Sequence, residues 1–340
     1  MILLHPHSYV PPSVSYDREE TLQKNLFQQI QLLDLTHPLP PFPDKSIVLL
    51  GFSCDEGVKR NLGRFGAADG PRHLRNTLKK FPLSFKTTIP LWDAGTICCC
   101  DDNLEQAQKL LGETVGALRA HGAFVIVLGG GHELSWGHFQ GLIKTYPKPI
   151  PISLSQSQER PSMDIINFDA HFDLRPLFPN NKGSSGSSFR QIHDYCQENN
   201  IGSRYACLGV QPFSNTSDLF EYAESIKAYH ILAEEMLHQP HRVHESLGLW
   251  LASAKKIYLT LCLDVFAAAF APGVSAPQAL GLSPHTLLPF FRQVLESGKV
   301  IGFDVAELNP IYDQDSHTAK LAASFVLEVL SHFATGKVIN

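Results

Sequence analysis

The sequence is poor in charge and has no strong excess of either sign. Only 18% of its 340 residues are charged, and 28 Lys and Arg stand against 33 Asp and Glu, for a formal net charge of −5. Nucleic-acid binding needs a basic excess, which is missing. Long apolar runs are missing too, since none approaches the roughly 20 residues of a membrane helix. The composition therefore argues against nucleic-acid and membrane partners.

Export and cysteine motifs are also lacking. The first residues, MILLHPHSYVPPS, have no basic start, sustained apolar stretch or small-residue cleavage site of a signal peptide. The seven cysteines contain no Cys-x-x-Cys pair, so neither a zinc ribbon nor a thioredoxin motif is supported. Three of them, Cys98 to Cys100, are consecutive in a predicted loop. Reduced thiols are the simplest interpretation, and we expect a cytoplasmic protein.

The chain divides into a short arm and one long domain. Residues 1–45 are rich in proline and contain a helix predicted over 17–33. We expect this N-terminal arm to pack on a main domain spanning 46–340.

Within the main domain, short apolar runs alternate with helical patterns. Strands are predicted at 46–52, 123–128, 165–168, 205–210, 257–263 and 300–303. Helices are predicted at 70–80, 104–121, 217–227, 242–254, 284–297 and 317–333. Continuous apolar strands between helices indicate an α/β domain whose parallel sheet is covered on both faces.

Polar side chains follow four of these strands. In open α/β sheets, ligands bind beyond the carboxyl ends of the strands. The four ends carry GGGHE (129–133), DAHFD (169–173), Cys262 with Asp264, and Glu307 in DVAELNP (304–310).

The spacing within these ends favours a metal site. Residues two apart in an extended segment share a face, so Asp169, His171 and Asp173 project together. His132 from another strand end would complete a set of nitrogen and oxygen ligands that suits Mn²⁺, Zn²⁺ or Fe²⁺. Several carboxylates can bridge two cations, and such a pair can activate a water molecule.

Each motif alone has an ordinary structural explanation. A single Asp-x-His-x-Asp is often a solvated turn, and a glycine run with one histidine is often only a tight turn. A cysteine inside a strand is usually a buried small hydrophobe, and a lone glutamate is often a surface acid. Their occurrence together at four strand ends is what favours the metal site.

Taken together, the motifs resemble the ureohydrolase family of arginase and agmatinase. The resemblance rests on GGGHE (129–133), NFDAHFDLR (167–175), LCLDVFAAAFAPGVSAP (261–277) and DVAELNP (304–310), and it spans about residues 46–335. Within the family, the chain is most similar to the formimidoylglutamase branch. That similarity rests on APGVSAP (271–277), on Leu174-Arg175 and on RNLGRFGA (60–67).

The resemblance implies a three-layer α/β/α fold with a mostly parallel sheet and two Mn²⁺ ions per chain. It implies hydrolysis of the small molecule N-formimidoyl-L-glutamate to L-glutamate and formamide, in histidine degradation. The implied metal ligands are His132, Asp169, His171, Asp173 and Asp264, with Asp169 shared between the ions. Catalytic roles are implied for Asp264 and for Glu307, which would orient the amidinium of the substrate.

Cys262 departs from the family pattern, because it occupies the position of a second bridging aspartate. A metal can deprotonate a thiol, so Cys262 could bind one ion or bridge both. It could also weaken the site, or only fill space in the strand. The sequence leaves these alternatives open.

The substrate's two carboxylates require a cationic partner. Arg175, Arg64 and Arg60 are predicted at the same edge of the sheet as the metal ligands, and arginine binds carboxylates through its fork of donors. Internal ion pairs are the alternative for all three. The polar segment 182–189 is expected to line the pocket or to form a flexible linker. His193 and His138 are candidate proton donors, with ordinary core or surface histidines as the alternative.

Two other functions remain possible at this point. The first is an agmatinase or guanidino-acid hydrolase, which would release urea rather than formamide. The second is a weakly active or silent metal-binding homologue, suggested only by Cys262. A homo-oligomer is compatible with each of these functions.

Overall fold

The computed structural model describes residues 7–13, 26–82, 89–145 and 161–335. They build one ten-stranded sheet in the order β1-β4-β3-β5-β10-β9-β6-β7-β8, with β2 also paired to β4. The strands are Tyr9–Val10 (β1), Ile30–Leu32 (β2), Ile47–Ser53 (β3), Leu91–Cys98 (β4), Phe124–Gly129 (β5), Asp164–Phe168 (β6), Tyr205–Val210 (β7), Tyr229–Leu232 (β8), Ile257–Cys262 (β9) and Val300–Ala306 (β10). Every pairing is parallel except that of β1 with β4.

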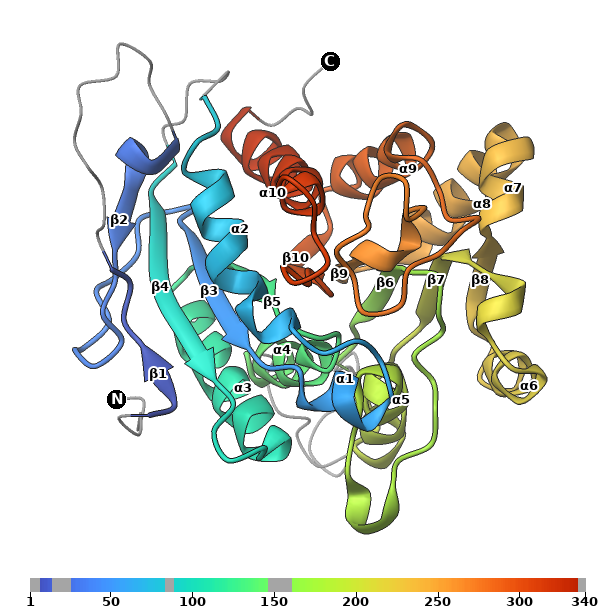
Figure 1. The fold of residues 1–340 in the computed structure, drawn as a ribbon, viewed down its shortest axis with the longest axis horizontal. Coiled ribbons are helices and arrows are strands. Elements are labelled where there is room, and N and C mark those ends of the chain that lie inside the picture. The colour runs from blue at the N-terminus through green and yellow to red at the C-terminus, as the bar shows by residue number, and fades with distance from the viewer. Residues whose placement is uncertain (1–6, 14–25, 83–88, 146–160, 336–340) are drawn as a thin grey trace, which may run out of the picture.

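Helices cover both faces of this sheet (Figure 1). They are Glu56–Arg60 (α1), Gly70–Leu78 (α2), Leu104–Ala120 (α3), Leu134–Lys144 (α4), Ser188–Glu198 (α5), Ser217–Ser225 (α6), Ala233–His238 (α7), Pro240–Ser253 (α8), Pro284–Glu296 (α9) and His317–Thr335 (α10). The arrangement is the expected three-layer α/β/α fold with a mostly parallel sheet.

Two hydrophobic cores separate the layers. Along β5, Phe124, Ile126 and Leu128 belong to the core that also contains residues of α2 and α7 to α10, whereas Val125 and Val127 belong to the core that contains residues of α3 to α6. Successive side chains of a strand point to opposite faces, so a strand buried on both sides is apolar at every position. This explains why β5 shows a continuous apolar run rather than an alternating one.

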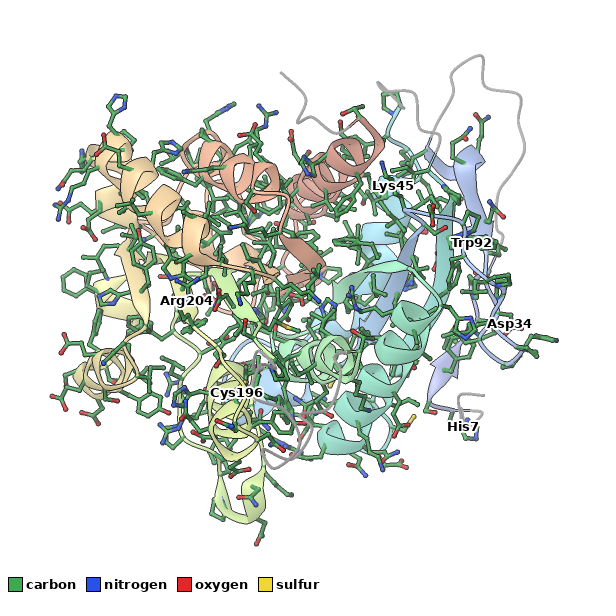
Figure 2. The ribbon with its side chains drawn as sticks, turned by 180° about the vertical axis from the view of Figure 1, so that it is seen from behind. His7, Asp34, Lys45, Trp92, Cys196 and Arg204 are labelled. Carbon is green, nitrogen blue, oxygen red and sulfur yellow. The ribbon has the colours of Figure 1, made fainter. Side chains whose placement is uncertain are left out.

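The N-terminal arm contributes strands to the sheet edge. Tyr9 pairs with Ile97 of β4, and Ile30 pairs with Leu91 at the start of the same strand. Figure 2 shows His7, Asp34 and Trp92 together along this edge of the molecule, with Arg204 toward the opposite side.

Some sequence predictions for this region were wrong. The helix predicted over 17–33 is not a continuous helix in its described part, where Leu26–Gln29 forms a short 3-10 turn and Ile30–Leu32 is β2. Pairing with an available strand edge outweighs the weak local preference for helix. Cys98 is the last residue of β4 rather than part of a loop. The sequence analysis also predicts no strand at β4 or β8 and no helix at α1, α4, α5 or α7.

Among the helices of the described residues, none combines the length and the apolarity that a membrane crossing requires.

Candidate metal centre and active site

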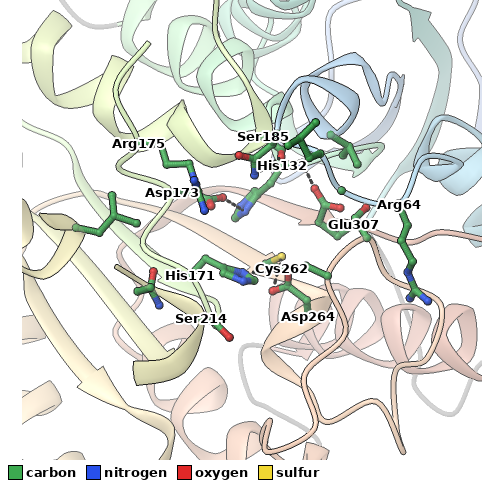
Figure 3. A pocket seen from close by; sticks show the side chains of 18 residues that line it. Arg64, His132, His171, Asp173, Arg175, Ser185, Ser214, Cys262, Asp264 and Glu307 are labelled. Carbon is green, nitrogen blue, oxygen red and sulfur yellow. Dashed lines mark hydrogen bonds and ion pairs between the residues drawn. The ribbon is translucent and has the colours of Figure 1, made fainter. Parts of the chain in front are cut away.

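The four strands whose ends carry the predicted ligands are neighbours in the sheet. Their order is β5-β10-β9-β6, so their carboxyl ends meet at one edge. A cavity of about 240 Å³ opens there (Figure 3). Its lining includes His132, His171, Asp173, Cys262, Asp264 and Glu307. The sheet order therefore brings together residues that are up to 175 positions apart in the chain.

A tight glycine turn places His132 at this edge. A Cβ atom on Gly130 would lie 2.4 Å from the carbonyl oxygen of Cys54 and 2.6 Å from that of Phe52. Only glycine allows β5 to pass so close to the end of β3. The Oγ of Ser188, at the start of α5, then donates to the His132 carbonyl at 3.0 Å and fixes the turn from the other side.

The first group of possible ligand atoms surrounds the His132 ring. Its Nδ1 lies 2.9 Å from Oδ2 of Asp173 and 3.0 Å from Oδ2 of Asp169. The Sγ of Cys262 belongs to the same group, because ligand atoms of His132, Asp169 and Cys262 all lie within 4.8 Å of one another.

A second group lies beside the first and shares Asp169 with it. The Nδ1 of His171 is 3.4 Å from Oδ1 of Asp169 and 3.2 Å from Oδ2 of Asp264. Asp169 thus offers one oxygen to each group, as a carboxylate that bridges two cations would. The backbone N–H of His171 donates to Oδ1 of Asp169 at 2.7 Å and helps to orient this carboxylate.

The donor atoms fit divalent metal ions. Although Nδ1 of His132 is buried against two carboxylates, it makes no hydrogen bond with the described residues. Its Nε2 lies 2.9 Å from Oγ1 of Thr260. If Nε2 carries the proton and donates to Thr260, Nδ1 presents its lone pair to the cluster. Histidines that bind metals are held this way, with the second ring nitrogen fixed by a hydrogen bond.

Burial of the carboxyl groups and their closeness to the histidines make the site hold protons when no cation is present. Burial and the nearby Asp169 charge raise the pKa of Asp173 to about 6. Burial opposes the charged form of both histidines, but the facing carboxylates raise the pKa of His132 and of His171 well above the usual value. Burial also raises the pKa of Asp264. Divalent cations would replace these protons, because the ligands must be deprotonated to bind.

Glu307 lies next to the ligand groups in a strained backbone conformation. Its φ is +74°, in the left-handed region that costs a non-glycine residue free energy. Its Oε1 accepts a hydrogen bond from the His132 backbone N–H at 2.6 Å, while Oε2 has no partner among the described residues. Burial and then the charge of Glu133 raise the pKa of Glu307 to about 8. An unpartnered, buried carboxylate oxygen is an acceptor for a cationic ligand.

The three arginines predicted to bind the substrate carboxylates have different surroundings. Arg175 lies on the Asp173 side of the cluster (Figure 3), and its guanidinium forms no hydrogen bond or ion pair with the described residues. Arg64 also lines the cavity, but its guanidinium donates to the carbonyls of Pro272 and Val274. It therefore holds the 271–277 segment in place.

The structure contradicts the prediction that Arg60 binds the substrate carboxylates. This arginine is not among the residues that line the cavity, and its guanidinium binds Glu56 at 3.0 Å and Glu105 at 2.6 Å. The internal ion pair, which was the alternative, is the arrangement in the structure. A guanidinium with two carboxylate partners has little capacity left for a ligand.

Comparison with known proteins gives the family. The model of the arginase family matches residues 45–331. The chain belongs to the arginase family.

Several arginase-family relatives are similar over nearly their whole length. The formimidoylglutamase of Legionella pneumophila (strain Lens) is 40% identical over 321 residues, which is 94% of this chain and 95% of the relative. The formimidoylglutamase of Clostridium tetani is 41% identical over 298 residues, 87% of this chain and 86% of the relative.

Solved structures agree with the fold. The formiminoglutamase of Trypanosoma cruzi, solved with Mn²⁺, matches with a TM-score of 0.71 and 25% identity, covering 86% of this chain and 94% of that one. The formimidoylglutamase of Bacillus subtilis gives a TM-score of 0.76 at 20% identity, covering 94% of this chain and 95% of that one.

The proposed proton donors of this arginase-family chain lie away from the cavity. His138 is fully buried, with Nδ1 2.6 Å from Oδ2 of Asp304. His193 lines a separate small cavity beside Tyr205. Neither lines the cavity of the ligand groups, so the alternative of ordinary buried or surface histidines fits both.

Other cavity residues were only partly predicted. Ser185 belongs to the 182–189 segment, which is no flexible linker, because Ser184 to Ser188 are buried and lead directly into α5. Asn61, Ser214, Asn215 and Ser275 also line the cavity and were not singled out. Ser214 and Asn215 follow β7, so extending the strand-end rule to this strand would have found them.

Proposed function

We propose that this chain hydrolyses N-formimidoyl-L-glutamate to L-glutamate and formamide. One observation carries the proposal: the free Oε2 of Glu307 lies in the same cavity as two ligand groups joined by Asp169. This combination suits a cationic amidine that must be held and attacked in one place. Relatives that are about 40% identical and bear the name formimidoylglutamase support the choice of substrate.

The two ligand groups would hold two Mn²⁺ ions. His132, Asp169 and Asp173 would hold one, and His171, Asp169 and Asp264 the other, with Cys262 as a further ligand. Manganese polarises substrate oxygen or nitrogen atoms and lowers the pKa of water, so that hydroxide is available near neutral pH. The structure of a Trypanosoma cruzi relative with Mn²⁺ supports this choice of metal.

The chain's own residues then orient the reacting carbon. The positive charges of the bound ions and of the amidinium would favour the ionised form of Glu307, which then accepts a charge-assisted hydrogen bond from the amidinium and holds it beside the ligand groups. Asp264, ionised when it holds an ion, would accept a hydrogen bond from the tetrahedral intermediate. The hydrogen bond from the His132 backbone N–H keeps the Glu307 carboxylate in position before substrate arrives.

Arg175 binds the glutamate end of the substrate. Its guanidinium has no other partner in the described residues, and the lining of the cavity also includes the polar residues Asn61, Ser185, Ser214 and Asn215. Gly186 lets the arginine stem pack closely, because a Cβ atom there would lie 2.9 Å from its Cδ. Arg64 supports the opposite wall by holding the 271–277 segment.

A panel of substrates tests the proposal. The purified, manganese-loaded protein is incubated with N-formimidoyl-L-glutamate, agmatine, arginine and 4-guanidinobutyrate, and products are identified by proton NMR. We expect formamide and glutamate from the first compound and little urea from the others. Release of urea as the main product would reject the substrate, and no turnover of any compound would support the silent homologue instead.

The agmatinase alternative is disfavoured by charge. The far end of agmatine is an ammonium group, which a cavity wall carrying the unpaired Arg175 would repel.

We also propose a cytoplasmic location and a role in histidine degradation. All seven cysteines are free in the structure, as expected for thiols in a reducing compartment. The role in histidine degradation follows from the proposed substrate.

A further inference from the structure

Cys262 distinguishes this metal centre from one built only of histidines and carboxylates. We propose that the Cys262 sulfur binds as a thiolate shared by both metal positions, and that it shifts the metal preference of the centre toward softer divalent ions such as Zn²⁺ and Co²⁺. This inference rests on the proposed dinuclear site, but it concerns metal binding and not the identity of the substrate.

The position of the sulfur relative to both ligand groups is the main argument. The Sγ of Cys262 lies in one group with His132 and Asp169, whose ligand atoms are all within 4.8 Å of one another. The same Sγ donates a hydrogen bond to Oδ1 of Asp264 at 3.0 Å, and Oδ2 of this carboxylate faces His171 in the second group, so the sulfur lies next to that group without being part of it. Two ligands on opposite sides of one ion, each about 2.3 Å from it, are about 4.6 Å apart, so both groups are compact enough for one ion each.

In the structure without metal, the Cys262 thiol donates a hydrogen bond to Asp264, so its one polar contact is to another candidate ligand. Cys262 ends β9, its side chain is 2% exposed, and it lines the cavity with Asp264 two residues later. A cysteine that only filled space would be expected among apolar side chains, as Cys196 is in its core cluster. Figure 3 shows the Cys262 sulfur next to the Asp264 carboxylate, with the His171 ring beside both.

The chemistry of sulfur then sets the metal preference. When an ion binds, the thiol proton leaves to solvent and the sulfur forms its bonds to the ions. Thiolate ligands favour zinc and other softer ions, whereas carboxylates suit manganese. Mn²⁺ also binds most weakly in the general order of divalent first-row metals. The Cys262 sulfur would increase the difference in affinity between Zn²⁺ and Mn²⁺, and an aspartate at this position would reduce it.

Spectroscopy on the intact wild-type protein tests the sulfur directly. The protein is stripped with a chelator, reduced, and loaded with two equivalents of Co²⁺ or Zn²⁺. We expect a near-ultraviolet sulfur-to-cobalt charge-transfer band, and X-ray absorption of the zinc form should show a sulfur shell at about 2.3 Å. With two zinc ions per chain, a shared sulfur gives on average about one sulfur per zinc, and a sulfur on one ion gives about half.

The matched variants are Cys262→Asp, Cys262→Ser and the control Cys196→Ser, whose cysteine lies in α5 and not in the cavity lining (Figure 2). The band and the sulfur shell should vanish in the first two and persist in the control. In competition titrations, Cys262→Asp should lower the zinc-to-manganese affinity ratio by about tenfold or more.

The outcomes separate this inference from the proposed function. A wild-type protein without the band and the sulfur shell, or with only half a sulfur per zinc, overturns the shared thiolate. An unchanged affinity ratio in Cys262→Asp overturns its role in metal preference. If two metals bind through sulfur but formimidoylglutamate is not hydrolysed, the sulfur ligand stands and the proposed substrate fails.

Discussion

Thr260 provides a sensitive test of how the centre is built, because it touches His132 and does not line the cavity. Its Oγ1 is 2.9 Å from Nε2 of His132, and both residues are buried. Replacing Thr260 with Val keeps the shape of the side chain and removes the hydroxyl. The His132 ring then has no acceptor for an Nε2 proton.

The magnitude follows from that lost acceptor. A buried donor left without a partner costs about 1–3 kcal/mol. The cost falls mainly on the metal-bound state, because a metal on Nδ1 forces the proton onto Nε2. In the metal-free state the ring can give up its Nε2 proton to solvent and keep the one on Nδ1, which faces Asp169 and Asp173 at 3.0 and 2.9 Å. Metal affinity should therefore fall by about 5- to 140-fold.

Metal dissociation constants measured by competition with a chelator provide the assay, with circular dichroism to confirm folding. Thr260→Ser is the control, since it retains the hydroxyl and loses only a buried methyl, at about 1 kcal/mol of folding stability. We expect its metal affinity to stay close to that of the wild type. Equal affinity for Thr260→Val and the wild type, or equal weakening by both substitutions, would refute the assigned tautomer of His132.

The remaining predictions concern charge. Glu307→Gln keeps an acceptor for the His132 N–H but loses the charge, so kcat/KM for formimidoylglutamate should fall by at least about 10²-fold with unchanged manganese content by atomic absorption. Arg175→Ala should raise KM far more than it lowers kcat or metal content. The control is Arg72→Ala, which removes an exposed arginine paired with Asp69 and should leave KM unchanged. Equal KM values for the two variants would show that Arg175 does not bind the substrate carboxylates. For metal-free protein, the raised pKa values of Asp173 (about 6) and Glu307 (about 8) mean that the native state holds more protons than the unfolded state, whose carboxyl pKa values are about 4. Its free energy of unfolding should therefore fall as pH rises from about 4 to 8, and a rising urea midpoint over this range would contradict the assignment.

Local pattern predicted those parts of the fold in which local preference and tertiary packing agree. The run AFVIVL became β5, shifted by one residue at both ends, and the helix predicted over 104–121 became α3, which ends one residue earlier. The polar helix predicted in the arm failed where Ile30 pairs with Leu91 at the sheet edge. Helix propensity is a local property of the sequence and contains no information about a pairing strand 61 residues away.

The site shows the same division. His132, Asp169, His171, Asp173 and Asp264 could be selected because strand-end position and two-residue spacing are local properties of the chain. The roles of the arginines could not be, because a guanidinium is held by whichever acceptor lies nearest in space. Arg60 faces Glu105, which is 45 positions away, and Arg64 faces Val274, which is 210 positions away.

The sequence by itself determined the chemical types of the candidate ligands, the strands that carry them and the presence of a cysteine among them. The tertiary structure decided which side chains share the cavity, because the order β5-β10-β9-β6 is set by packing between distant segments. It also decided which charges stay free: Arg175 and one oxygen of Glu307 remain without partners in the described structure, while Arg60 is neutralised by carboxylates beside it. Short-range patterns specify which groups are available, but only long-range packing sets the distances of a few ångströms on which electrostatic and metal-binding chemistry depends.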